Sequence, residues 1–399
     1  MISLSHLEPY AGDPILSLNE AYQQDSRSHK VNLSVGIYFD EDGRVPIFDC
    51  VRQAEAQMLA QAEPKPYLPM EGDPAMRQAV AELLLGRHHE ALRQQRVCTI
   101  QTVGSSGGLR VGAEFVKRWF AHSDLWVSDP TWDNHRAVFE AAGLRVHTYP
   151  YYDKDSGGVR FEAMCEALSE LAERSVVLLH GCCHNPTGVD LTVQQWDQVI
   201  DIVLRRNLLA FVDLAYQGYG EGLEEDAYAV RALAQRGATF LVANSFSKSM
   251  SVYGERAGAL SVVCPDQQQA QLALGQFKAI IRRIYSSPAL HAAGIVSRVL
   301  SQPALRSAWE KDVAGMRSRI VQMRQALYAA LHELCPNRSV EFIIVQRGMF
   351  TYTGLSAEQV DRLRDEFAVY LVRSGRLCLT GLNHHNVAAT AQALAQVMR

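Results

Sequence analysis

Short apolar runs alternate with longer amphipathic stretches between about residue 97 and residue 264. Six runs have the length of strands, and several are apolar at consecutive positions: 97–103, 125–129, 175–182, 208–213, 239–246 and 258–264. Consecutive apolar residues are typical of strands covered on both faces, as in a parallel sheet. Segment 191–206 carries apolar residues at helical spacing instead. The pattern therefore predicts an open α/β sheet with covering helices.

A long helix is predicted to follow the sheet, starting near Pro303. One of its faces repeats an apolar residue every three or four positions, as in an amphipathic helix: Trp309, Val313, Met316, Ile320, Met323, Leu327, Leu331 and Leu334. Beyond this helix, the short strands "GMFTYTG" (348–354) and "RLCLTG" (376–381) mix with helical stretches. This last part predicts a smaller α+β domain.

Composition and charge narrow the functional classes. The chain has 399 residues and a formal net charge of -4, without a block rich in lysine and arginine, so we expect no nucleic-acid partner. It has no recognisable secretory signal and no apolar run of membrane-spanning length, so we expect no membrane association. Its 8 cysteines include no C-x-x-C pair, which indicates a reducing compartment. We therefore expect a cytoplasmic protein.

Polar and ionisable residues gather where the predicted strands end. In open α/β sheets ligands bind at the carboxyl ends of the strands, so these segments are expected to share one site. They are "GSSGG" (104–108), "DPTW" (129–132), "HNPTG" (184–188), "DLAY" (213–216) and "NSFSK" (244–248).

The glycine-rich segment 104–108 has three interpretations. It can be a plain turn, which is the most frequent case for such a segment alone. It can also cradle a phosphate with the N–H groups of a helix N-terminus. Finally, it matches G-x-S-x-G, the nucleophile elbow of α/β-hydrolases, with Ser106 as the nucleophile.

Asp213 and the segment "HGCCHNPTG" (180–188) raise the question of a metal. A carboxylate at the end of a buried strand needs a cation or donors, so Asp213 can pair with a protonated ring nitrogen, bind a metal or cap the next helix. Tyr216 lies about one turn further on. Adjacent cysteines in a strand are expected to point to opposite faces, and no second cluster has zinc spacing. We therefore expect no metal.

Lys248 ends an apolar strand, where a solvated lysine is out of place. A lysine near other cations and away from water has a lowered pKa and is a usable nucleophile and base. Arginines, which bind carboxylate and phosphate, interrupt apolar or small-residue contexts at Arg256, Arg282 and Arg376. Pyridoxal phosphate chemistry requires a lysine, an aspartate that pairs with the ring nitrogen, an aromatic ring that stacks on the cofactor, a phosphate-binding turn and arginines. The chain offers candidates for all of them, with Trp132 as the stacking ring. Together they predict pyridoxal 5'-phosphate as cofactor.

With these motifs the chain resembles the class I, fold-type I aminotransferases over nearly its whole length. Within them it is most similar to the bacterial aromatic amino acid (tyrosine) aminotransferases of the aspartate aminotransferase family. The resemblance rests on "VNLSVGIYFDEDG", "YLPMEG", "VSDPTW", "HGCCHNPTG", "DLAYQGYG", "NSFSKSMSVYGERAGALS", "RRIYSSP", "RGMFTYTGLS" and "YLVRSGRLCLTGLN".

The resemblance implies an α/β fold in two parts. The large domain, residues 46–315, is expected to bind the cofactor with a mostly parallel seven-stranded sheet flanked by helices. Residues 1–45 and 316–399 are expected to form an N-terminal arm and a smaller α+β domain. The resemblance also implies a homodimer with shared active sites. Its expected ligands are small molecules, namely amino acids and 2-oxo acids.

Roles in cofactor binding follow from the same resemblance. Lys248 is implied to hold the aldehyde covalently and to move the proton between Cα and C4′. Asp213, supported by His135, pairs with the ring nitrogen. The remaining implied contacts are Asn185 and Tyr216 to the phenolic oxygen, Trp132 to the ring face, and Ser105, Ser106, Ser245, Ser247, Arg256 and the partner subunit's Tyr67 to the phosphate.

Substrate contacts are implied as well. Arg376 is expected to bind the α-carboxylate, with Gly36, Trp132 and Asn185 nearby. The partner subunit's Arg282 is expected to bind the distal carboxylate of dicarboxylic substrates. Family members usually have asparagine where Ile284 stands, two residues after this arginine.

The predicted reaction is ping-pong transamination of phenylalanine, tyrosine, tryptophan, aspartate and glutamate with 2-oxoglutarate. The aromatic preference rests on residues at positions where aspartate-specific relatives tend to carry smaller or more polar ones: Ile37, Phe39, Val45, Pro66, Ser106 and Ser287. An aspartate-specific aminotransferase is the main alternative. A serine hydrolase using Ser106 is a distant one, since no histidine is an evident partner.

Overall fold

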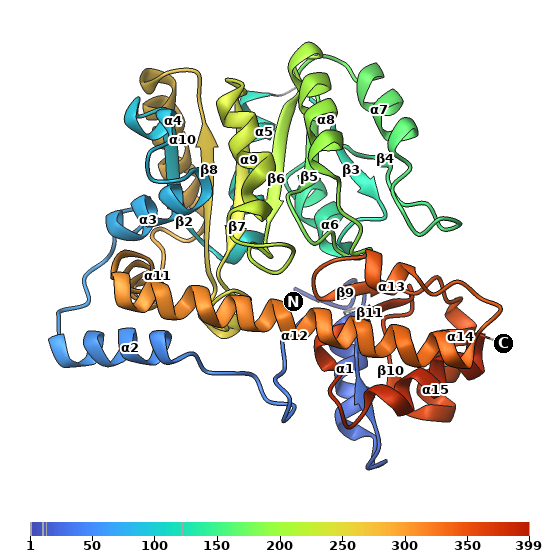
Figure 1. Ribbon diagram of the computed structural model, residues 1–399. Coiled ribbons are helices and arrows are strands. Elements are labelled where there is room, and N and C mark those ends of the chain that lie inside the picture. The colour runs from blue at the N-terminus through green and yellow to red at the C-terminus, as the bar shows by residue number, and fades with distance from the viewer. Residues whose placement is uncertain (1, 10–11, 13, 121–122, 399) are drawn as a thin grey trace.

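The computed structural model describes residues 2–9, 12, 14–120 and 123–398. Its centre is a seven-stranded sheet between two layers of helices (Figure 1). In spatial order the strands are β2 (Val97–Val103), β8 (Ala257–Val263), β7 (Phe240–Ser245), β6 (Leu209–Leu214), β5 (Val176–His180), β3 (Leu125–Asp129) and β4 (Val146–Pro150). β8 runs in the direction opposite to that of the other six strands. The predicted mostly parallel sheet is confirmed.

The consecutive apolar residues of the central strands are buried on both faces. Leu209 and Phe211 of β6 join one hydrophobic cluster, whereas Ala210 and Val212 join another. The first cluster is shared with α5 (Gly104–Trp119), α6 (Asp133–Ala141) and α10 (Gln267–Ile284). The second is shared with α3 (Pro74–Leu85), α7 (Phe161–Glu170), α8 (Val193–Arg205), α9 (Tyr228–Gln235) and α11 (Leu290–Ser301).

Two further helices extend the second layer. The helix α2 (Asp49–Gln61) packs on α11 and on α12 (Pro303–Leu334), and the short α4 (Glu90–Arg93) packs on α3 and α9. The strand β4 was not predicted from the apolar pattern. As an edge strand it leaves Val146 and His147 half-buried and Thr148 exposed, so it lacks a continuous apolar run.

A third cluster joins both ends of the chain. It contains Val31 and Leu33 together with residues of α12 and the C-terminal segment. The elements around it are α1 (Pro14–Gln24), β1 (Val31–Asn32), α13 (Phe342–Val345), β9 (Phe350–Tyr352), α14 (Ala357–Phe367), β10 (Val369–Tyr370), β11 (Arg376–Cys378) and α15 (Val387–Met398). β1 pairs with β10 and β9 with β11. The division into domains at residues 46–315 stays a prediction.

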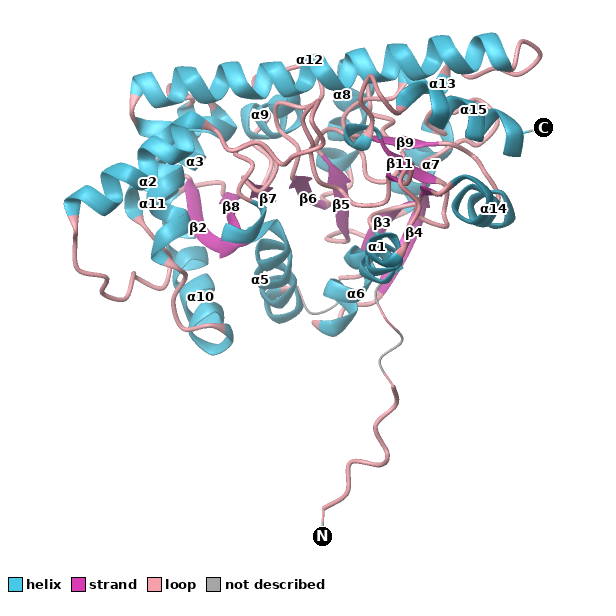
Figure 2. Cartoon of the chain, turned by 90° about the horizontal axis from the view of Figure 1, so that it is seen from below, coloured by secondary structure: helices cyan, strands magenta, loops and turns pink. Residues whose placement is uncertain are grey.

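The helix α12 begins at Pro303 as predicted and runs past both parts of the molecule (Figures 1 and 2). Its Trp309, Val313 and Ile320 belong to the core beside the sheet, whereas Met323 and Leu327 belong to the third cluster. The predicted apolar face is therefore divided between two cores. None of the helices in the described ranges is long and apolar enough to cross a membrane.

The sheet positions its ligand edge by a close backbone contact. Gly258 of β8 packs on the turn that starts α5, since a Cβ at this position would lie 2.4 Å from the carbonyl carbon of Gly104. Gly104 itself has a φ of 63°, in the left-handed region that favours glycine. The strand β2 and the helix α5 thus meet at a tight turn that points to the edge where β6 and β7 end.

We predict that Trp309→Ala lowers the free energy of unfolding by about 3–5 kcal/mol, because it leaves a cavity in the core. The indole is fully buried, and its Nε1 donates to the Ser249 carbonyl at 2.7 Å. Urea unfolding followed by circular dichroism measures the change. The matched control is Gln322→Ala on the exposed side of the same helix, for which we expect less than about 0.5 kcal/mol. Equal losses for both variants would contradict the burial argument.

Candidate active site

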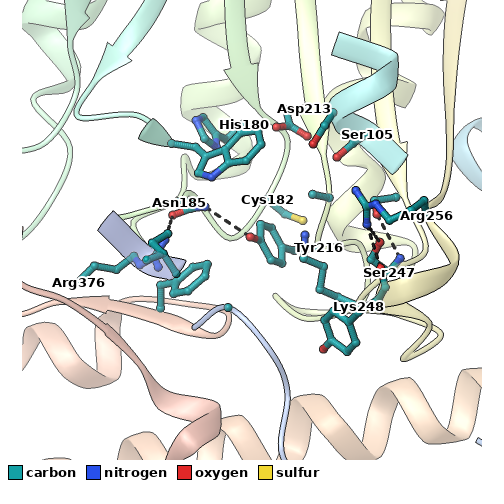
Figure 3. A pocket seen from close by; sticks show the side chains of 18 residues that line it. Ser105, His180, Cys182, Asn185, Asp213, Tyr216, Ser247, Lys248, Arg256 and Arg376 are labelled. Carbon is teal, nitrogen blue, oxygen red and sulfur yellow. Dashed lines mark hydrogen bonds between the residues drawn. The ribbon is translucent and has the colours of Figure 1, made fainter. Parts of the chain in front are cut away.

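A cavity of about 250 Å³ lies where β5, β6 and β7 end, beside the start of α5 and the strands β9 and β11 (Figure 3). It brings together twelve of the predicted site residues: Gly36, Ser105, Ser106, Trp132, Asn185, Asp213, Tyr216, Ser245, Ser247, Lys248, Arg256 and Arg376. Segments far apart in the sequence therefore converge on one site, as the strand-end argument predicts.

Lys248 lies at the centre of this cavity, in the turn that follows β7. The turn is held by the Tyr219 hydroxyl, which donates to the Lys248 carbonyl at 3.0 Å, and by the Trp309 indole on the next residue. The Lys248 Nζ lies 4.8 Å from the centre of the Tyr216 ring. Burial lowers the pKa of the amine to about 8, and the charges of Arg256 and Arg376 act in the same direction, against that of Asp213.

Asp213 enters the cavity from the end of β6 and is hydrogen-bonded from behind. Its Oδ2 lies 2.9 Å from His135 Nε2, and His135 Nδ1 lies 2.8 Å from the Thr131 hydroxyl. Burial raises the pKa of the carboxyl, but the His135 hydrogen bond and nearby positive charges outweigh it and hold the pKa below its usual value. The buried Oδ1 has no hydrogen-bond partner among the described residues. Asp213 is thus an anion with one oxygen left for a donor.

Hydroxyls and one arginine form the end of the cavity nearest α5. Arg256 Nη1 donates to the Ser247 hydroxyl at 3.2 Å, and Arg256 Nη2 packs closely on Gly104. Ser105 and Ser106 stand in the first turn of α5, a helix of 16 residues, whose N-terminus favours negative charge. This end of the cavity is suited to a phosphate or another oxyanion.

Arg376 forms the opposite end, on the far side of Tyr216 and Asn185 in Figure 3. Its Nη2 donates to the Ser34 carbonyl at 2.7 Å and its Nη1 to Asn185 Oδ1 at 3.3 Å, while its Nε has no partner among the described residues. The guanidinium also lies 4.5 Å from the centre of the Phe350 ring. A buried cation bound only to neutral groups favours an anionic ligand such as a carboxylate.

Three predicted site residues do not line the cavity. His135 stands behind Asp213, in the supporting position that was predicted. Tyr67 is 95% exposed, and Arg282 points to the Ser286 hydroxyl, outside the cavity. Both were predicted to serve the partner's site, and that prediction needs a second chain.

Six lining residues were not predicted to belong to the site. Two of them, His180 and Cys182, lie in the segment "HGCCHNPTG" but were considered only as metal ligands. Burial lowers the pKa of His180 to about 3, so this imidazole is neutral near pH 7. The others are Ile15, Ala215, Tyr253 and Phe350, whose residue types give no sequence signal of ligand binding.

The sequence profile of aminotransferase class I and II matches residues 28–394. The chain belongs to this family. The aromatic-amino-acid aminotransferase of Escherichia coli (strain K12) is 55% identical over 393 residues, which cover 98% of this chain and 99% of that protein. An aspartate aminotransferase of Pseudomonas aeruginosa is 47% identical over 398 residues and is covered completely.

A solved structure has the same fold throughout. The aromatic-amino-acid aminotransferase of Burkholderia pseudomallei, covalently bound to pyridoxal phosphate, has a TM-score of 0.98 with 45% sequence identity over 100% of both chains. The cavity described above thus belongs to an aminotransferase.

The hydrolase alternative gains no support in this aminotransferase. Ser106 does stand at a turn between a strand and a helix. However, no described histidine is hydrogen-bonded to it. His135 and His180 at this edge of the sheet interact with Asp213 and Thr131, and the neighbouring His184 interacts with Ser128 and Thr187. Within residues 2–9, 12, 14–120 and 123–398, Ser106 therefore has no partner that could act as the general base an activated serine requires.

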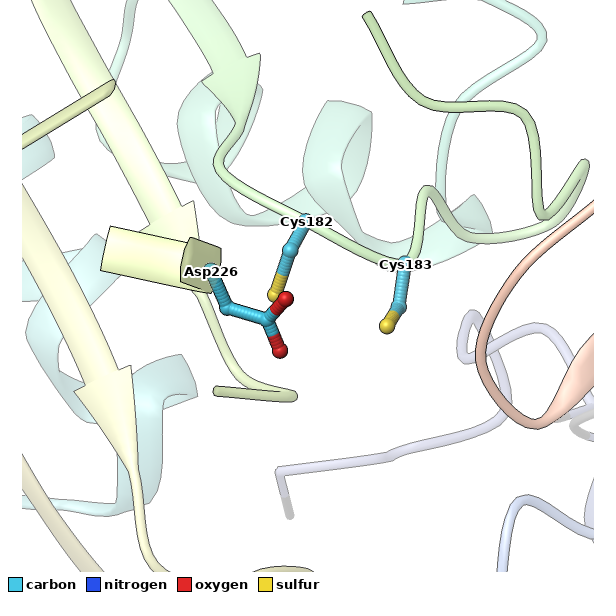
Figure 4. Close-up of side chains that lie close together, drawn as sticks. All are labelled: Cys182, Cys183 and Asp226. Atoms are coloured by element: carbon cyan, nitrogen blue, oxygen red, sulfur yellow. The ribbon is translucent and has the colours of Figure 1, made fainter. Parts of the chain in front are cut away.

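One expectation about the cysteines is wrong. Cys182 and Cys183 were expected to point to opposite faces, yet their sulfur atoms and an oxygen of Asp226 all lie within 4.8 Å of one another (Figure 4). The strand β5 ends at His180, and Cys183 has a φ of 51°, so strand alternation no longer applies. Asp226 accepts hydrogen bonds from the backbone N–H groups of Gly218, Gly220 and Glu221. The absence of a metal stays a prediction.

We predict that Lys248 in ligand-free protein is acetylated by acetic anhydride with a midpoint near pH 8, because only the neutral amine reacts. Competitive labelling across a pH series, read by mass spectrometry, measures the midpoint, with the exposed Lys154 as internal reference. Arg256→Gln removes a positive neighbour, so the charged amine becomes more stable and the midpoint should rise. A midpoint that stays unchanged in this variant would contradict the electrostatic explanation.

Proposed function

We propose that this aminotransferase catalyses pyridoxal 5'-phosphate-dependent transamination of aromatic and dicarboxylic amino acids with 2-oxoglutarate. The observation that carries the proposal is the half-buried Lys248 amine between two anion-binding ends of one cavity, next to the buried carboxylate of Asp213. Ping-pong kinetics follow if one cavity serves the amino acid and the 2-oxo acid in turn.

The residues present fit this cofactor. The unpartnered Asp213 Oδ1 suits a protonated ring nitrogen, and the hydroxyls around Arg256 suit the phosphate. Trp132 lines the cavity as a ring that can stack on the cofactor, and it packs edge-on against His135 at 5.2 Å. When bound, the cofactor supplies an aldehyde that accepts the amino group and a ring that accepts electrons from the substrate.

Each protein group has a role that its surroundings support. The Lys248 amine, with its pKa lowered to about 8, is present partly in the neutral form near pH 7 and can take up and return the substrate proton. The Tyr216 hydroxyl and the Asn185 amide, 3.5 Å apart, can bind an oxygen on the cofactor ring. Asp213 remains ionised because its pKa is below the usual value. Arg376 can orient the substrate by its α-carboxylate.

The apolar groups next to Arg376 support a substrate with an aromatic side chain. Phe350 lies directly under its guanidinium, and Ile15 and Trp132 line the same cavity. Burying ring surface there contributes about 25 cal/mol per Å2. The E. coli relative is named an aromatic-amino-acid aminotransferase, which agrees with this proposal. An aspartate-specific enzyme is the second candidate, favoured by the name of the P. aeruginosa relative.

A homodimer with shared active sites is part of the proposal. Tyr67 and Arg282 lie outside the cavity of their own subunit and are accessible to another chain. Large apolar side chains are exposed as well, with Ile47 79% and Leu59 83% accessible, and an interface would cover them. We also propose a cytoplasmic location, since all cysteines are free thiols.

We predict that Lys248→Ala abolishes transamination, with kcat reduced by at least about 10³-fold, because the variant loses both covalent attachment and the proton carrier. The assay follows formation of glutamate from 2-oxoglutarate and phenylalanine. Binding of the cofactor, measured by fluorescence quenching, should persist, because Asp213 and Arg256 remain. Full activity of the variant would refute the proposed function.

Substitution of Arg376 and of Arg282 is expected to change kcat/KM for phenylalanine and aspartate differently. Arg376→Ala is expected to lower kcat/KM for phenylalanine and for aspartate by about 30-fold or more, since truncating one partner of a buried charge pair costs about 2–5 kcal/mol. Arg282→Ala should lower kcat/KM for aspartate similarly but leave phenylalanine within about threefold. Steady-state kinetics with both amino acids measure this. A wild-type enzyme without measurable activity on phenylalanine would favour the aspartate-specific alternative.

A further inference from the structure

Gln101 lies outside the cavity but occupies an unusual position for a long polar side chain. It stands in β2 and is only 3% exposed. Two residues later the strand ends, and the turn at Gly104 begins the helix α5, whose N-terminus faces the phosphate end of the cavity. In Figure 1 this strand lies at one edge of the sheet, close to α3 and α10. A buried amide must be satisfied by other groups, and here both partners are loops.

The first loop is the segment that carries Tyr67. The Gln101 backbone N–H donates to the Glu71 carbonyl at 2.9 Å, and its Oε1 accepts from the Asp73 N–H at 3.2 Å. Between them, Gly72 has a φ of 92°, and a Cβ there would lie 2.3 Å from Gln101 Cβ. The backbone of this segment therefore rests directly on Gln101.

The second loop follows Arg282. The Gln101 Nε2 donates to the Ala289 carbonyl at 2.7 Å, and the Gln101 carbonyl accepts from the Tyr285 hydroxyl at 3.4 Å. Between these two contacts lies Ser286, the residue to which Arg282 is hydrogen-bonded. The loop that holds Arg282 in place is therefore fixed to the same strand.

Two ion pairs on one carboxylate support the connection between the two segments. Lys278 of α10 lies 3.2 Å from Glu71, and Arg77 of α3 lies 3.8 Å from the same carboxylate, which is 14% exposed. These groups hold the helix of Arg282 near the segment of Tyr67, but they leave the loop positions to Gln101. A glutamine side chain is needed here, because the amide donates to one loop and accepts from the other.

We propose that Gln101 is a positioning residue that sets Tyr67 and Arg282, the two groups that each subunit contributes to its partner's active site. The inference rests on the shared-site homodimer proposed above. One strand then fixes both the phosphate turn of its own subunit and the groups offered to the neighbour. A misplacement of about 1 Å can reduce activity by about 10²-fold, so a loss of Gln101 should be measurable in the partner's site.

The test uses hybrid dimers purified with two affinity tags, so that each has one working site. In the first, Lys248→Ala and Gln101→Leu are combined in one subunit beside a wild-type subunit, whose site receives Tyr67 and Arg282 from the altered chain. We expect kcat/KM for aspartate to fall by about 10–100-fold there, and less for phenylalanine, which does not need Arg282. In the second, Gln101→Leu stands in the subunit that keeps Lys248, and activity per site should stay within about threefold of wild type.

Thr99→Val is the matched control. Thr99 lies on the same face of β2 and is buried, and its hydroxyl is hydrogen-bonded to Ser261 at 2.8 Å rather than to either loop. It should change neither hybrid by more than about threefold. Gln101→Met, of similar length but without the amide, should reproduce the effect of Gln101→Leu.

The outcomes are distinguishable. The inference is wrong if activity falls mainly in the second hybrid, where Gln101→Leu stands in the subunit that keeps Lys248, or if it falls equally in both hybrids. Failure of both Gln101 variants to assemble would also overturn it. A third hybrid, Arg282→Ala beside Lys248→Ala, tests the shared site itself, since it should regain activity on aspartate. If it does not, the proposed dimer is wrong; if it does and Gln101→Leu acts only in its own subunit, the positioning role alone is refuted.

Discussion

The structure depends on keeping an amine out of water among other charges. Lys248 is half-buried where β7 ends, with Asp213 as the attractive charge and two arginines as repulsive ones. Desolvation lowers the pKa of the amine, and the arginines lower it further, so the neutral form becomes available near physiological pH. The Asp213 carboxylate can stay charged in the same place because His135 donates to it. The rest of the fold serves to hold these groups in that arrangement.

Much of this arrangement could be predicted from the sequence. Runs such as "LLAFVD" are apolar on consecutive residues, and they indicate two buried faces because both Phe211 and Val212 must be covered. Since such strands lie in one sheet, the residues after them meet at one edge, and Lys248, Asp213 and Asn185 could be assigned to one site. Arg376 could be assigned only by resemblance, because a short strand of a separate α+β unit carries no pattern that points to this edge.

Other features depend on local geometry that the pattern does not contain. The strand β4 is an edge strand with an exposed residue, so its periodicity is weak. The thiols of Cys182 and Cys183 converge because the strand has already ended and Cys183 is left-handed, which residue alternation cannot reveal. Phe350 lines the cavity only because β9 and β11 pair and present it under the Arg376 guanidinium. In each case the deciding factor is a contact between distant segments.

The helix α12 has a consequence for cooperativity. Its 32 residues span about 48 Å as one continuous element, and its apolar face packs into the sheet core along one half and into the C-terminal core along the other. Neither core can lose its packing without exposing part of a helix that the other needs. The two cores therefore form a single unfolding unit, and a destabilising change near one end of the chain is felt at the active site through the stability of the whole.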